Sequence, residues 1–133
     1  MLLALQILNL LAEESEDTTP DAFSFTDVSG VALSDTITST AITITGINAA
    51  AAITITGGTY DINESDTFTS DPGTVDNGDT VRARHTSSAS YLTATNTTVT
   101  IGGISDVFTS ITLGDPANAA YVYRPYSFNW WSH

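Results

Sequence analysis

The stretch TAITITGI, residues 40–47, decides the fold class, because apolar and polar side chains alternate along it. Strict alternation is typical of a β-strand that has one buried and one exposed face. The stretch ITIT, residues 53–56, repeats the same pattern a few positions later. We expect Ile42, Ile44 and Ile47 to face a hydrophobic core. The centre of the chain therefore predicts neighbouring strands.

Strand and turn signals continue on both sides of this centre. We expect further strands in residues 23–26, 31–33, 60–62, near 68, 81–86, 97–101 and 104–113, and a short strand or a corner at residues 91–92. Turn signals separate them at Gly57-Gly58, Asp71-Pro72-Gly73, Asn77-Gly78-Asp79 and Gly102-Gly103. Short strands with a turn signal about every 8–12 residues are the pattern of an all-β sandwich. In residues 81–86, alternation predicts that Val81, Ala83 and His85 point inward, and that Arg82 and Arg84 point outward.

The charge balance excludes some partners. The chain has 15 acidic residues against three arginines and no lysine, for a formal net charge of −12. Such a surface repels phosphate backbones and anionic lipid surfaces, so we expect no nucleic-acid partner and no membrane partner. Cysteine is absent, so the sandwich lacks the inter-sheet disulfide of antibody domains.

The N-terminal segment, residues 1–14, predicts a short α-helix that attaches the protein to a partner. It is rich in strong helix formers, and its apolar side chains cover nearly the whole circumference, which requires burial. These side chains are Leu2, Leu3, Leu5, Ile7, Leu8, Leu10 and Leu11. A signal peptide would need a basic start and a small-residue cleavage site, and a transmembrane span would need about 20 apolar residues. We therefore favour docking on partner subunits over either alternative.

Two further segments flank the predicted sandwich, which we place at residues 23–113. Residues 15–22 are polar and acidic with one proline, and we interpret them as a linker. Residues 114–133 form an extended tail in which aromatic side chains crowd together. Aromatic anchors near an arginine are typical of interface hot spots, so we favour an arm that inserts into a partner over a tail that folds back on the core. The expected anchors are Tyr121, Tyr123, Tyr126, Phe128, Trp130 and Trp131.

Several short motifs lie in residues 23–34, 44–48, 56–60, 77–84, 86–91 and 100–103. In their order and spacing they resemble an immunoglobulin-like module of bacterial surface proteins and of virion proteins of tailed phages, and the resemblance covers roughly residues 23–113. It implies an immunoglobulin-like antiparallel β-sandwich and no active-site residues. A single module with a helix and an aromatic tail looks like a capsid decoration (cement) protein or another accessory virion protein.

This resemblance implies a structural, non-enzymatic role on the virion exterior. The expected partner is the major capsid protein or another virion protein, with a homo-oligomer, such as a trimer, as the expected assembly. The alternative is a tail-fibre or adhesin module on a virion or a bacterial cell surface. In that role Trp130 and Trp131 would stack on glycans.

Candidate chemistry in the sequence is sparse, and we expect no cofactor. The two histidines are His85, which we interpret as a strand residue at a sheet edge or against Tyr91, and the terminal His133. Asp61, Asn63 and Asp66 gather oxygen ligands that suit calcium. They lack the pattern of an EF-hand loop, so we favour a solvated acidic loop over a calcium site.

Overall fold

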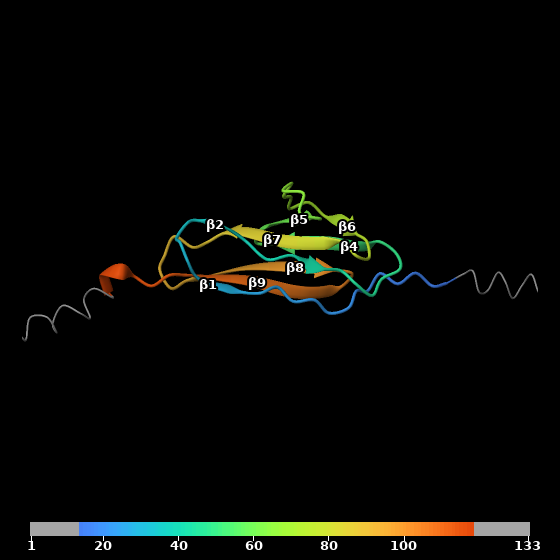
Figure 1. The fold of residues 1–133 in the computed structure, drawn as a ribbon, viewed down its shortest axis with the longest axis horizontal. Coiled ribbons are helices and arrows are strands. Elements are labelled where there is room, and N and C mark those ends of the chain that lie inside the picture. The colour runs from blue at the N-terminus through green and yellow to red at the C-terminus, as the bar shows by residue number, and fades with distance from the viewer. Residues whose placement is uncertain (1–13, 119–133) are drawn as a thin grey trace, which may run out of the picture.

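The computed structural model describes residues 14–118, which form two β-sheets packed face to face (Figure 1). The strands are β1 (Val28–Val31), β2 (Thr36–Thr38), β3 (Ile42–Thr43), β4 (Ala51–Thr56), β5 (Thr59–Ile62), β6 (Gly73–Val75), β7 (Thr80–Thr86), β8 (Ala94–Ile101) and β9 (Ile104–Thr112). The predicted all-β, two-sheet architecture is confirmed for these residues.

The larger sheet has the strand order β1-β9-β8-β4-β6. Its centre is the β8–β9 hairpin, whose antiparallel register runs from the Ala94–Ile111 pair to the Ile101–Ile104 pair. The predicted Gly102-Gly103 turn closes this hairpin. β1 runs parallel to β9, so the sheet is antiparallel except at this edge.

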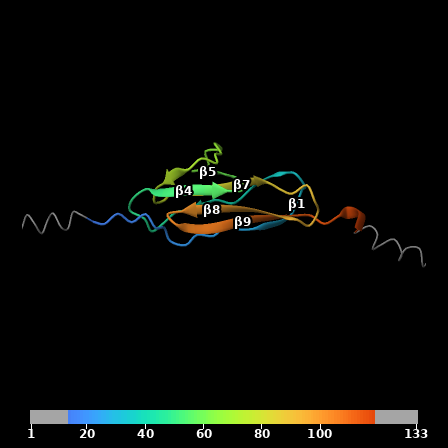
Figure 2. The ribbon, with the colours of Figure 1, turned by 180° about the vertical axis from the view of Figure 1, so that it is seen from behind.

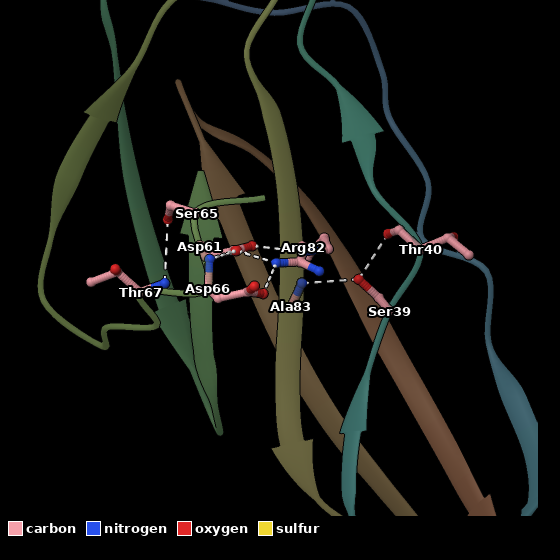
Figure 3. Close-up of polar contacts among 8 residues, drawn as sticks. All are labelled: Ser39, Thr40, Asp61, Ser65, Asp66, Thr67, Arg82 and Ala83. Atoms are coloured by element: carbon pink, nitrogen blue, oxygen red, sulfur yellow. Dashed lines mark hydrogen bonds and ion pairs between the residues drawn. The ribbon is translucent and has the colours of Figure 1, made fainter. Parts of the chain in front are cut away.

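The smaller sheet is built around β7. β5 pairs with one edge of β7, and the short strands β2 and β3 both pair with β7 as well. Between β2 and β3, Ser39 continues the pairing, because its amide donates to the Ala83 carbonyl at 2.8 Å. Its hydroxyl oxygen in turn accepts the Ala83 amide at 2.9 Å (Figure 3). A side chain thus replaces a main-chain acceptor at this irregularity.

The core lies between the two sheets and confirms the predicted alternation. Ile42, Ile44 and Ile47 are all buried. Along β7, residues 81, 83 and 85 are buried, while Arg82 and Arg84 lie on the outer face. The aromatic centre is Phe108, which is fully buried and lies 6.4 Å from Phe25 between ring centroids.

Three expected strands take other forms. Of residues 31–33 only Val31 belongs to a strand, at the end of β1. Residues 23–26 are in no ladder, although Phe25 is buried and its amide donates to the Asp106 carboxylate at 2.8 Å. Phe68 also lies outside the strands, next to an isolated bridge between Tyr60 and Thr69. Phe25 is buried and Phe68 is half-buried, so each ring packs on the sandwich without belonging to a continuous ladder.

Residues 15–22, which we expected to separate a helix from the sandwich, lie against the sandwich instead. The carbonyl of Asp17 accepts the amide of Asn48 at 3.0 Å, and the amide of Asp21 donates to the carbonyl of Thr45 at 2.8 Å. Pro20 is buried. These main-chain bonds make the segment part of the folded body.

The described chain enters and leaves the sandwich at opposite ends of its long axis. The N-terminal segment, blue in Figures 1 and 2, lies at one end, and the segment after β9, red, lies at the other. Both views agree on this placement. The two limits of the described range therefore lie at opposite poles of the sandwich.

Candidate functional site

An ion-pair cluster on the outer face of the smaller sheet joins β5, β7 and the loop that follows β5 (Figure 3). The register pairs Asp61 with Arg82, so both side chains point to the same face. Arg82 Nε donates to Asp61 Oδ1 at 3.0 Å, and a second guanidinium nitrogen bonds Asp61 Oδ2. That nitrogen also bonds Asp66 Oδ1 at 2.7 Å.

The carboxylate of Asp61 is buried, with 1 % of the residue exposed, yet it is held in its charged form. Burial by itself would raise the pKa of Asp61. Hydrogen bonds from Arg82 and from the Asp66 amide, together with the charges of Arg82 and Arg84, outweigh burial and lower this pKa. The hydrogen bonds to Asp61 and then Asp66 raise the pKa of Arg82. Asp61 and Arg82 therefore form a structural ion pair in which both side chains are charged.

Phe68 covers this face and orders the two outward arginines. The Arg84 guanidinium carbon lies 3.7 Å from the Phe68 ring centroid, and that of Arg82 lies 5.4 Å away. Cation–π contacts of this kind are worth about 0.5–1 kcal/mol at exposed sites. Arg84 differs from Arg82 in making no ion pair with the residues of the range 14–118.

An open depression of about 440 Å³ adjoins Arg84 on this face. Its floor includes the Gly57-Gly58 link between the two sheets, where a side chain at Gly58 would collide with the carbonyl of Arg84. The lining is polar and small. It consists of Thr36, Gly57, Gly58, Thr59, Arg84, His85 and Thr86.

His85 lines the bottom of this depression, but its side chain is buried in the protein interior, with 5 % of the residue exposed. It sits on the central strand β7 and stacks on Phe108 at 5.0 Å, so the expected edge position or packing against Tyr91 is not what forms. Its Nδ1 lies 2.7 Å from Thr97 Oγ1, and its Nε2 lies 2.7 Å from Ser110 Oγ.

The hydrogen-bond network selects one tautomer of His85. The Thr97 hydroxyl donates its only proton to the Gly57 carbonyl at 2.9 Å, so its oxygen accepts from His85 Nδ1–H. Nε2 is then the acceptor of the Ser110 hydroxyl. Burial lowers the pKa of His85, because the charged imidazolium is poorly solvated here. Ser110 is fully buried, so this serine–histidine contact is packed between the sheets and out of contact with solvent.

The candidate calcium ligands Asp61, Asn63 and Asp66 are each held by protein partners. The two carboxylates meet at the Arg82 guanidinium. The Asn63 amide instead donates to Asp79 at 2.9 Å and accepts the Thr80 amide at 3.0 Å. Within residues 14–118, no three histidine, cysteine or acidic side chains gather as a metal site would require.

All the predicted partner-binding side chains lie outside the described residues. These are Leu2, Leu3, Leu5, Ile7, Leu8, Leu10, Leu11, Tyr121, Tyr123, Tyr126, Phe128, Trp130 and Trp131, and His133 lies outside as well. The depression was not predicted. Alternation did indicate the outward placement of Arg84, but nothing in the sequence indicated that Phe68, 16 positions earlier, would stack on it.

Among residues 14–118, no helix is long and apolar enough to cross a membrane. Comparison with protein-family models, with curated proteins and with solved structures found no match to this chain.

Proposed function

We propose that this protein is a structural, non-enzymatic accessory protein of a tailed-phage virion, of the capsid decoration type, attached through its terminal segments. The observation that carries the proposal is the placement of the two limits of the described range. The described chain enters and leaves at opposite poles of a self-contained sandwich (Figures 1 and 2). The apolar segment before residue 14 and the aromatic segment after residue 118 can therefore reach separate partner surfaces.

The strand order supports an immunoglobulin-like assignment. In that fold, strands B, E and D are neighbours in one sheet, and strands C, F and G are neighbours in the other. In the smaller sheet, β2 and β3 together take the position of strand B, β7 that of strand E and β5 that of strand D. In the larger sheet, β4, β8 and β9 take the positions of strands C, F and G. Two features are additions to that scheme: β1 pairs parallel with β9, and β6 extends the larger sheet beside β4.

The use of the titratable side chains supports a structural role. Asp61 is bonded to Arg82, and His85 is bonded through both ring nitrogens. Every buried side-chain nitrogen and oxygen among the described residues has a hydrogen-bond partner. Catalytic acids and bases need access to a substrate proton, whereas Asp61 and His85 are buried and already hydrogen-bonded to neighbouring side chains.

The two-ended geometry refines the mode of attachment. A decoration protein anchored at one end would project its sandwich outward and leave the opposite pole in solvent. Because the described chain begins and ends at opposite poles, attachment through both terminal segments would let the sandwich bridge two surfaces, such as adjacent capsid subunits or a capsid subunit and a second copy of this chain. The net charge of −12 then keeps the body of the sandwich from associating with other copies except through its ends.

Truncation tests this proposal. Virions or capsids lacking the protein are mixed with the full chain, with a variant lacking residues 1–13 and with a variant lacking residues 119–133, and bound protein is counted after sedimentation. We expect each truncation to abolish or strongly reduce binding. A Tyr91→Ala variant, altered at an exposed corner of the sandwich, is the matched control and should bind normally. Undiminished binding by both truncated forms would refute attachment through the ends.

A further inference from the structure

Arg84 is an unusual side chain in this acidic protein. It carries one of the two positive side chains in residues 14–118, and Arg82 is already held by two carboxylates. The Arg84 guanidinium makes no hydrogen bond or ion pair with the described residues, and Arg84 is one of the residues that line an open depression of about 440 Å³. A guanidinium carries five N–H donors. Because those of Arg84 meet no acceptor among the described residues, the group is suited to bind an acceptor on a ligand.

The Arg84 guanidinium is also held in position before any ligand arrives. It lies 3.7 Å over the Phe68 ring. Stacking on an aromatic ring uses the face of the guanidinium and leaves its N–H edges available for planar, two-pronged recognition. A side chain that is already ordered loses less conformational entropy on binding.

Hydroxyl groups surround this charge. The register pairs Thr59 with Arg84 and Thr36 with Thr86, so these side chains share the outer face of the smaller sheet. The hydroxyls of these three threonines form no hydrogen bond with other described residues, whereas the buried hydroxyls of Ser39, Ser87, Thr97 and Thr112 do. The Gly57-Gly58 backbone beside them brings no side chain into the space.

The combination selects a class of ligand. An unpaired guanidinium calls for an anion, and neighbouring hydroxyls call for a ligand that carries hydroxyls of its own. A polyanion is disfavoured by the net charge of −12, so we favour a ligand that carries a single carboxylate, placed on Arg84. The volume is near the lower end of the range of about 300–1,000 Å³ for ligand pockets, which suits a small ligand.

We propose that the depression at Arg84, Thr36, Thr59 and Thr86 binds a carboxylate-bearing sugar, a uronic or sialic acid unit, with the carboxylate on the guanidinium. The site is separate from the terminal segments that carry the attachment role, so either proposal can fail without the other.

Titration of the ¹⁵N-labelled full chain with glucuronate tests the site. We expect amide shifts at Gly58, Arg84 and Thr86 that saturate with a dissociation constant on the order of 1 mM, as suits a ligand of this size. Glucose, which lacks the carboxylate, and acetate, which lacks the hydroxyls, should each bind at least about tenfold more weakly. Equal shifts with glucose, equal shifts with acetate, or no shift with glucuronate or N-acetylneuraminate would overturn the proposal.

Substitutions in the depression test whether its own side chains bind glucuronate. Arg84→Gln should weaken glucuronate binding about tenfold or more, since a charge-assisted hydrogen bond is lost, and Arg84→Lys should retain part of it. Thr86→Val, which removes a hydroxyl and keeps the shape, should weaken binding by a smaller factor. Thr56→Val, on the exposed face of β4, is the matched control and should bind as the parent does. Parent-like binding by Arg84→Gln and Thr86→Val would overturn the proposal.

Discussion

Acidification from pH 7 to pH 5 should destabilise this protein through His85. The imidazole is buried, stacks on Phe108 and is bonded to Thr97 and Ser110. Its Nε2 accepts the Ser110 proton, so protonation of Nε2 would break that bond and place a charge between the sheets. The pKa of His85 is lowered in the folded protein by burial, so protons bind more readily to the unfolded chain.

The size of the effect follows from this difference in proton uptake. The unfolded imidazole titrates near its ordinary pKa of 6.5. Over each pH unit below this value in which only the unfolded chain is protonated, the free energy of unfolding falls by about 1.4 kcal/mol. At pH 5 the accumulated loss reaches an upper limit of about 2 kcal/mol, and it stops growing once the folded state also takes up the proton.

Urea denaturation at half-unit steps between pH 7 and pH 5 measures this loss. His85→Gln is the matched variant, because glutamine offers a donor and an acceptor near Thr97 and Ser110 but has no titrating group. The variant should be less stable than the parent at pH 7 and should show a flatter dependence on pH. The reasoning would be refuted by parallel pH profiles for the two proteins.

Three other outcomes follow from the packing. Arg82→Met leaves the Asp61 carboxylate buried without its guanidinium, so the stability of the variant relative to the parent, measured by denaturation, should be reduced at pH 7, and this deficit should shrink toward pH 4 as the carboxylate takes up a proton. The parent should in addition lose the contribution of Asp61 as the pH falls below 3.8 through the lowered pKa of this group, and a deficit that stays constant with pH would contradict this view. Phe108→Ala should cost about 3–5 kcal/mol in the free energy of unfolding and Phe108→Leu less, whereas equal small losses would show a loose core. Gly102→Ala puts a Cβ against the Thr18 carbonyl at positive φ, so hydrogen exchange should speed up at the main-chain bonds of residues 15–22, and unchanged exchange would show that this segment is held elsewhere.

Alternation alone predicted the strands whose inner faces are apolar. Ile42 and Ile44 were expected in the core and are buried there, and the pattern of β7 correctly assigned its inner and outer side chains. Such strands are predictable because each side chain's face depends only on its own position along the strand. The β8–β9 hairpin was predictable for a similar local reason, since the Gly102-Gly103 turn lies between two alternating runs.

The candidate site depends on contacts between distant residues and was not predictable in this way. Arg82 meets Asp61 only because β5 and β7 pair in one particular register, 21 positions apart in the sequence. Phe68 reaches Arg84 from a loop that has no periodic pattern. Residues 15–22 looked like a linker because a polar segment held by main-chain bonds has the same composition as a solvated one.

The acidic composition acquires a local explanation from these contacts. Seven carboxylates accept a main-chain amide, in loops and at strand ends where the ladder leaves N–H groups unpaired; they belong to Asp17, Asp27, Asp35, Asp61, Asp79, Asp106 and Asp115. Aspartate suits this task because its short side chain reaches nearby amides, and a charged acceptor strengthens the bond. Much of the negative charge is thus explained by loop structure and is no sign of a cationic partner. By the same argument Arg84, which stacks on Phe68 but makes no ion pair with a described residue, is the positive charge of residues 14–118 that the fold leaves without a hydrogen-bonded acceptor.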